Sequence, residues 1–168
     1  MRISSRTHYG LRAMTELAKT YGQRTLSLSE IASVEHLPLP YLEQLVSPLR
    51  RAGLIEGTRG AHGGYRLTRP PAEITVGQVV RVLEGPDATA PVECLSESYV
   101  EGGCTRESAC ASRPLWARLK AAFDAVVDST TLADLCLEAA PAPAGWSRRI
   151  ELSPEMTCLK ETPVPAHG

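Results

Sequence analysis

The stretch LSEIASVEHLPLPYLEQLVSPLRRAGLIEGTRGAHGGYRL, residues 28–67, predicts two short helices followed by a β-hairpin. The first helix is expected over 28–35, because Ser27 and Glu30 have the spacing of a capping box. A Leu-Pro-Leu break at 37–39 then separates it from the second helix. Two short runs at 54–56 and 64–67 flank a glycine-rich tip at 59–63, which is typical of a hairpin. Together these elements predict a winged helix-turn-helix, which places its second helix in the major groove of DNA.

The second helix has one apolar stripe and one outward face. Proline is well tolerated at the first helical position, where Pro40 is expected. Leucine and valine recur at i, i+3, i+4 and i+7, and Gly53 ends the pattern. We expect Leu42, Leu45, Val46 and Leu49 to be buried, and Tyr41, Glu43, Gln44, Arg50 and Arg51 to remain available outside. Pro48 lies inside this helix, and we expect a kink there.

Charge is divided unevenly along the chain although its net value is −1. Residues 1–72 contain ten Lys and Arg against five Asp and Glu, whereas residues 73–168 contain eight against fourteen. A basic face supplies the sequence-independent part of nucleic-acid affinity. It is also compatible with a solvated surface on which arginine stems cover apolar side chains. Charge alone therefore leaves both interpretations open.

The length of 168 residues suits one compact core with an extension. No run approaches the roughly 18 apolar residues that a membrane-spanning helix needs. The N-terminal sequence MRISSRTHYG lacks the apolar stretch of a signal peptide. We therefore expect a cytoplasmic protein with no membrane contact.

The remaining periodicity predicts a fold that is mainly α with a small β-hairpin. Further helices are expected at about 5–21, 76–84, 114–128 and 131–138. The helix at 114–128 carries a broad apolar stripe, which suits either a dimerisation helix or packing on its own domain. We divide the chain into a winged helix-turn-helix DNA-binding domain (1–85), a cysteine-rich cluster-binding loop (86–113), the dimerisation helix with a short closing helix (114–138) and a flexible tail (139–168).

Three of the five cysteines share the loop, in the pattern Cys94-x9-Cys104-x5-Cys110. A zinc site usually has one tight C-x2–4-C pair, and this loop has none. Wider spacing suits an iron–sulfur cluster, whose ligands are thiolates held on a wrapping loop. A structural metal and unliganded buried thiols remain the alternatives. Cys136 and Cys158 lie outside the loop, and we do not expect them to be ligands.

Several motifs together resemble the winged-helix iron–sulfur transcriptional regulators, among them IscR, NsrR and RirA. They are MRISSRTHYGLRAM, PYLEQLVSPLRRAGL, TRGAHGGYRL, ITVGQVV, the three cysteines and PLW, and they cover residues 1–138. The resemblance implies a homodimeric regulator, most often a repressor, whose cluster sets its affinity for double-stranded operator DNA. It also implies that Cys94, Cys104 and Cys110 are ligands, that Glu43 and Gln44 face bases and that Arg59 reaches the minor groove. The expected DNA-binding set is Pro40, Tyr41, Glu43, Gln44, Arg50, Arg51, Arg59 and His62.

The chain departs from these relatives at two places. Arg113 stands where the IscR type has a ligating histidine, and a guanidinium cannot ligate iron. His8 stands where the NsrR type supplies a carboxylate from the other subunit, so His8 of the partner subunit is our candidate fourth ligand, with the loop carboxylates as alternatives. We favour a 4Fe-4S over a 2Fe-2S cluster. Pro40 replaces a serine of the IscR type, so the operator is expected to differ.

The signal implied is iron, redox state or nitric oxide. Two other interpretations remain open from the sequence. One is a cluster-free regulator that acts through protein partners with its cysteines as thiol switches. The other is an iron–sulfur electron carrier or enzyme, for which the sequence offers no nucleophile–base pair, phosphate loop or second cofactor motif. We therefore expect a regulator without catalytic residues.

Overall fold

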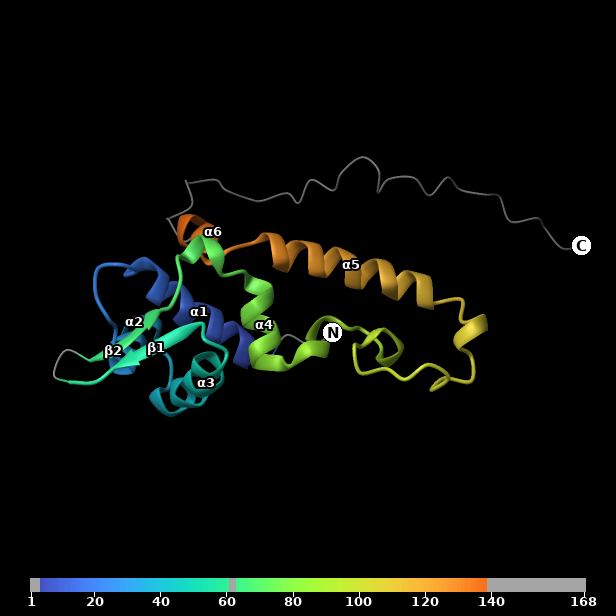
Figure 1. The fold of residues 1–168 in the computed structure, drawn as a ribbon, viewed down its shortest axis with the longest axis horizontal. Helices are drawn as coiled ribbons and strands as arrows, with labels where there is room; N and C mark the ends of the chain where they lie inside the picture. The colour runs from blue at the N-terminus through green and yellow to red at the C-terminus, as the bar shows by residue number, and fades with distance from the viewer. Residues whose placement is uncertain (1–3, 61–62, 139–168) are drawn as a thin grey trace, which may run out of the picture.

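The computed structural model describes residues 4–60 and 63–138 of the chain. Within them the elements follow in the order α1 (Ser5–Lys19), α2 (Leu28–Glu35), α3 (Leu39–Arg51), β1 (Ile55–Thr58), β2 (Gly64–Leu67), η1 (Pro71–Glu73), α4 (Val76–Glu84), η2 (Pro86–Thr89), η3 (Glu93–Leu95), η4 (Glu107–Ala109), α5 (Arg113–Ser129) and α6 (Leu132–Glu138) (Figure 1). The strands pair antiparallel, with Ile55 opposite Leu67 and Thr58 opposite Gly64. The predicted fold class, mainly helical with one hairpin, is confirmed.

Hydrogen bonds within a single turn set the starts of several helices. Ser27 Oγ accepts from the Glu30 amide at 3.2 Å, and the Ser27 amide donates to the Glu30 carboxylate at 2.7 Å. That backbone hydrogen bond, together with Arg24, lowers the pKa of Glu30 to about 2. Thr75 and Gln78 form a second capping box at α4. These helix starts therefore depend on neighbouring residues, as the sequence indicated.

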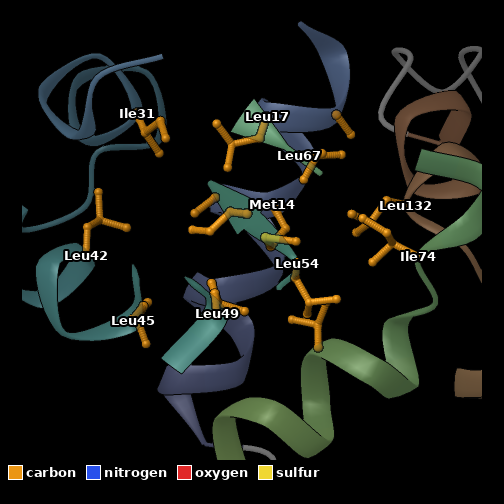
Figure 2. Close-up of a cluster of buried hydrophobic side chains, with 14 of the residues drawn as sticks. Met14, Leu17, Ile31, Leu42, Leu45, Leu49, Leu54, Leu67, Ile74 and Leu132 are labelled. Atoms are coloured by element: carbon orange, nitrogen blue, oxygen red, sulfur yellow. The ribbon is translucent and has the colours of Figure 1, made fainter. Parts of the chain in front are cut away.

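The core surrounds α1. Met14 lies at its centre, with Ile31, Leu42 and Leu45 on one side and Ile74 and Leu132 on the other (Figure 2). Met14, Ile74 and Leu132 have no exposed surface. Elements far apart in sequence, from the helix-turn-helix to α6, thus bury their apolar faces against one helix. We call α1 to α4, the hairpin and α6 the head.

Helices α1 and α4 approach closely. A Cβ built on Gly10 would lie 2.2 Å from Leu83 Cδ1, so a side chain there would displace Leu83. At the same contact Thr7 Oγ1 donates to Glu84 Oε1 at 2.6 Å, and Ser4 Oγ donates to the same oxygen. Thr7 is 1% exposed. The end of α4 is therefore tied to the start of α1.

Some predicted boundaries were wrong by one or two residues. The first helix ends at Lys19 rather than at residue 21, and α5 begins at Arg113. Helix α3 begins at Leu39, so Pro40 is its second residue, and the helix continues through Pro48 to Arg51. The loop contains three 3-10 turns, which a search for longer periods misses. Residues 139–168 and His62 lie outside the described residues.

Helix α5 runs away from the head, and the segment 86–112, which we call the cysteine loop, joins its far end (Figure 1). Of its apolar stripe only Val127 is buried, while Leu115, Leu119 and Val126 are 58%, 42% and 64% exposed. Packing on its own domain therefore leaves most of this stripe uncovered. None of the described helices is long and apolar enough to cross a membrane.

Replacing Leu132 by alanine should lower the free energy of unfolding by about 2–5 kcal/mol, because it removes a fully buried side chain with which α6 packs in the core. Leu137→Ala on the same helix is the matched control, and because Leu137 is 77% exposed it should change that free energy by less than about 0.5 kcal/mol. Urea unfolding at one fixed protein concentration measures both. Equal effects from the two variants would contradict the assigned core.

Candidate nucleic-acid interface and cysteine loop

The outer face of α3 carries most of the expected DNA-binding residues. Leu42, Leu45 and Leu49 are at most 2% exposed, which fixes the rotation of the helix. The opposite face therefore presents Pro40, Glu43, Gln44, Arg50 and Arg51, all of which are exposed.

Tyr41 differs from the other members of this set. It is half-buried, its ring packs edge-on against Tyr9 with centroids 5.4 Å apart, and its hydroxyl lies 3.4 Å from Ser5 Oγ. Tyr41 therefore joins the start of α3 to α1, a contact that helical periodicity does not reveal.

A hollow lies between α3 and the hairpin. Its lining comprises Glu43, Val46, Ser47, Arg50, Arg51 and Tyr65. Tyr65 was not among the predicted site residues. It pairs with Leu26 through two backbone hydrogen bonds, and a Cβ on Gly57 would lie 3.3 Å from its ring. The exposed face of α3 and the hairpin therefore border one concave surface.

Exposed arginines on α3 and directly after β1 differ from four other arginines of the described residues. Within residues 4–60 and 63–138, Arg12, Arg24, Arg66 and Arg81 pair with carboxylates. No ion pair is formed in the same part of the chain by Arg50, Arg51 or Arg59. Arg59 is exposed at the base of the hairpin tip. These three arginines can therefore engage phosphates without first breaking an internal pair.

The cysteine loop is organised by two carboxylates. Asp87 in η2 accepts from the Glu97 amide at 2.5 Å and from Ser98 Oγ at 2.7 Å. Glu107 accepts from the Gly102 amide at 2.8 Å and from Tyr99 Oη at 3.1 Å. Gly102 has φ 84°, a conformation that favours glycine. These contacts fold the chain around Cys104 while leaving its thiol exposed.

The four described cysteines are free thiols in different surroundings. Cys110 precedes α5, and hydrogen bonding from the Ser112 side chain, 3.5 Å away, together with the Ser112 and Arg113 amides, lowers its pKa. Cys136 on α6 lies 3.8 Å from the Thr15 carbonyl oxygen, and burial raises its pKa. Cys94 is half-buried and Cys104 is exposed.

Three free thiols on one loop suit an iron–sulfur cluster in ligand chemistry. They are not brought together, however, because among the described residues no three His, Cys, Asp or Glu side chains form a group that could hold a metal ion. His8, exposed on α1 with its ring 5.6 Å from that of Tyr9, is not grouped with the loop thiols of its own chain. A cluster would therefore require the loop to close around it.

Comparison with known proteins decides the family. A model of the Rrf2 family, described as an iron-dependent transcriptional regulator, matches residues 3–138. This chain belongs to the Rrf2 family of transcriptional regulators. The predicted resemblance is thereby confirmed, and a regulator, not an electron carrier or enzyme, is the class to which the chain belongs.

Two kinds of regulator appear among the relatives of this Rrf2 protein. The regulator CymR of Bacillus subtilis (strain 168) is 48% identical over 135 residues, covering 80% of this chain and 89% of CymR. A solved structure of CymR, described as the global cysteine regulator of B. subtilis, matches with a TM-score of 0.69 at 46% identity, covering 82% of this chain and 98% of that one. The structure of T. potens IscR matches with a TM-score of 0.66 at 36% identity, covering 89% and 94%.

In metal-free protein at pH 7.5, iodoacetamide should modify Cys104 and Cys110 at least about tenfold faster than Cys136, because a thiolate that is exposed or favoured by hydrogen bonds reacts first. Mass spectrometry of timed digests gives the three rates, and the same reaction in urea is the control in which the rates should converge. Modification of Cys136 as fast as Cys104 in the folded protein would contradict the assigned burial.

Proposed function

We propose that this Rrf2-family chain is a homodimeric repressor that reads operator DNA through α3 and the hairpin, with an affinity set by an iron–sulfur cluster on its cysteine loop. The observation that carries the proposal is the concave surface bordered by α3 and the hairpin, which Arg50 and Arg51 line. Like the exposed Arg59 after β1, these two arginines form no ion pair within the described chain. Such arginines are suited to binding phosphates.

Base reading falls to the exposed residues at the start of α3. The Glu43 carboxylate can accept from the amino group of cytosine, and the Gln44 amide can pair with adenine. Arg59 at the hairpin tip suits a narrow minor groove. Pro40 and Tyr41 would set the approach of α3 to the backbone. His62, which lies outside the described residues, remains part of the proposed set.

In this proposal a second copy of the chain packs against the exposed apolar side chains of α5. Leu115, Leu119 and Val126 are each more than two-fifths exposed on this helix. Exposed large apolar side chains on one helix favour an interface, and a two-fold dimer places two recognition helices on the half-sites of a palindrome.

Cys94, Cys104 and Cys110 would hold the cluster, and His8 of the partner subunit is the proposed fourth ligand in place of Arg113. When bound, the cluster supplies a group sensitive to iron supply, oxidants and nitric oxide, and a 4Fe-4S form is favoured. Support comes from the three free thiols on one loop and from the similarity to IscR. The chain's own contribution is the Asp87 and Glu107 contacts, which shape the loop near the thiols.

A second candidate is a cluster-free regulator that acts through protein partners with its cysteines as thiol switches. Three observations favour it. The similar CymR is described as a global cysteine regulator, and the three loop thiols are not gathered into a metal-binding group within the described residues. The pKa of Cys110 is also lowered by its hydrogen bonds with Ser112, which suits a reactive thiol.

Anaerobic purification with measurement of iron, sulfide and visible absorbance separates the two candidates. The cluster proposal predicts iron and sulfide in the wild-type protein, with their loss in Cys104→Ala. Cys136→Ala is the matched control and should retain the cluster, because Cys136 lies on α6 against α1. Wild-type protein without iron and sulfide after reconstitution would refute the cluster and leave the thiol candidate. An unchanged spectrum in His8→Ala would remove His8 from the ligand set.

Base readout has its own test. Glu43→Ala should relax preference at one base pair by about 1–3 kcal/mol, while affinity for random duplex DNA changes little, because Glu43 reads a base edge and not a phosphate. Glu73→Ala, an exposed glutamate in η1, is the matched control and should leave preference intact. Fluorescence anisotropy on operator, single-base variants and random duplex gives these differences. An equal change on every duplex would exclude direct readout by Glu43.

A further inference from the structure

Two sets of hydrogen bonds join helix α5 to the head, beside a small apolar contact. The first is a backbone connection at its C-terminal end, where Thr75 and Thr131 form an antiparallel bridge. The Val76 amide donates to the Thr130 carbonyl at 2.8 Å, and the Leu132 amide donates to the Ile74 carbonyl at 2.9 Å. This connection fixes where α5 leaves the head, but a helix held at one end alone can still swing.

The second connection is formed by Arg81 on α4 with Asp124 and Asp128 on α5, three residues that we call the clamp. Arg81 donates from both terminal nitrogens to the two oxygens of Asp128, each at 2.7 Å. Its Nη2 also lies 3.5 Å from Asp124 Oδ1. A bidentate guanidinium–carboxylate pair fixes orientation as well as distance. The clamp therefore sets the direction of α5 relative to α4.

Several neighbours hold the clamp in place. Asp124 Oδ1 is buried without a hydrogen-bond donor, so Arg81 provides its compensating charge. Lys120 donates to the other oxygen at 2.7 Å. A Cβ on Gly77 would lie 2.0 Å from Asp128 Oδ1 and 2.8 Å from Arg81 Nη1, so only glycine leaves room for this pair. The hydrogen bond from Arg81 lowers the pKa of Asp128, which keeps that carboxylate charged.

The rest of α5 has little to hold it within one chain. A small buried cluster of Val76, Val80 and Val127 lies beside the clamp. Towards its N-terminus the helix exposes Leu115 and Leu119. The 11 to 15 residues from its N-terminal end to the clamp span about 16–22 Å, so a swing of about 10° at the clamp moves that end by roughly 3–4 Å. That displacement is close to the rise of one base pair, about 3.4 Å.

The start of the cysteine loop also lies next to the clamp. Thr89, at the end of η2 and 1% exposed, lies beside Asp124 and helps to lower the pKa of that carboxyl. Two residues earlier, Asp87 holds the Glu97 amide and Ser98. The carboxylate that lies near Arg81 is therefore also next to the base of the cysteine loop.

We propose that Arg81 is the positioning residue that sets the spacing between the two recognition helices, by fixing the angle between α5 and the head through Asp124 and Asp128. The inference rests on the proposed dimer through α5. In such a dimer the two-fold axis applies the same angle to both heads, so the clamp determines which separation of operator half-sites fits best. Arg81 needs no contact with DNA for this role.

The test uses the full chain and an operator selected by the wild-type protein from a random duplex library. Duplexes are then made in which the spacer between half-sites varies one base pair at a time, and anisotropy gives each affinity. Wild type should prefer one spacer by about tenfold or more. In Arg81→Gln that preference should fall below about threefold or move to another spacer, while affinity for a single half-site stays within about twofold. Gly77→Ala should act similarly, because it displaces Asp128 without changing any charge.

Two further variants separate positioning from a general loss of structure. The charge-swapped pair Arg81→Asp with Asp128→Arg should restore a single preferred spacer. Arg24→Gln, which breaks the exposed pair with Glu30 on α2, is the matched control and should leave the preference unchanged. Thermal unfolding confirms that each variant is folded.

Light scattering identifies which proposal fails. A wild-type dimer whose spacer preference is the same in Arg81→Gln and Gly77→Ala would overturn the role of Arg81 and leave the dimer standing. A wild-type protein that is monomeric both free and on operator would overturn the dimer, and the role of Arg81 with it.

Discussion

The close contact between α1 and α4 is the constraint on which the rest of the molecule depends. Gly10 permits it, because a Cβ at that position would lie 2.2 Å from Leu83, and Glu84 seals it by accepting hydrogen bonds from Ser4 and Thr7. Helix α1 also carries the core on which the helix-turn-helix packs (Figure 2). Any displacement of α4 is therefore transmitted to the helix that supports the recognition helix.

Helix α4 consequently lies between α1 on one side and α5 with the start of the cysteine loop on the other. On one side it packs on α1, and on the other it holds α5 through Arg81 and the start of the cysteine loop through η2. The proposed DNA-binding surface and the cysteine loop thus share one element, although the hairpin and the loop lie on opposite sides of α4 (Figure 1). This arrangement gives a physical route by which the state of the loop can alter DNA affinity, provided that the two states make different contacts around α4.

Contacts between residues close together in the sequence were predictable, and contacts between residues far apart in the sequence were not. The capping boxes at Ser27 and Thr75 involve residues three apart, so reading along the chain finds them. The burial of Leu42, Leu45 and Leu49 on α3 follows from helical period, whereas Val46, on the same predicted stripe, is only half-buried. The pair between Arg81 and Asp128 joins residues 47 apart, and no periodic pattern marks it. For the same reason the sequence alone did not show that Gly10 and Gly77 are needed for close contacts between helices. Cysteine spacing indicated a shared loop, but the closing of that loop depends on what it binds.

The measurement that tests this account most directly is the ratio of operator affinities for one anaerobic preparation before and after removal of its iron and sulfide. Coupling between the cysteine loop and the head predicts a ratio of at least about fivefold, the lower end of ordinary allosteric coupling. The ratio should become one in Cys104→Ala, which keeps the DNA surface but lacks a loop thiol. Equal affinity of the loaded and stripped wild-type protein for operator would contradict the claim that the loop controls DNA binding.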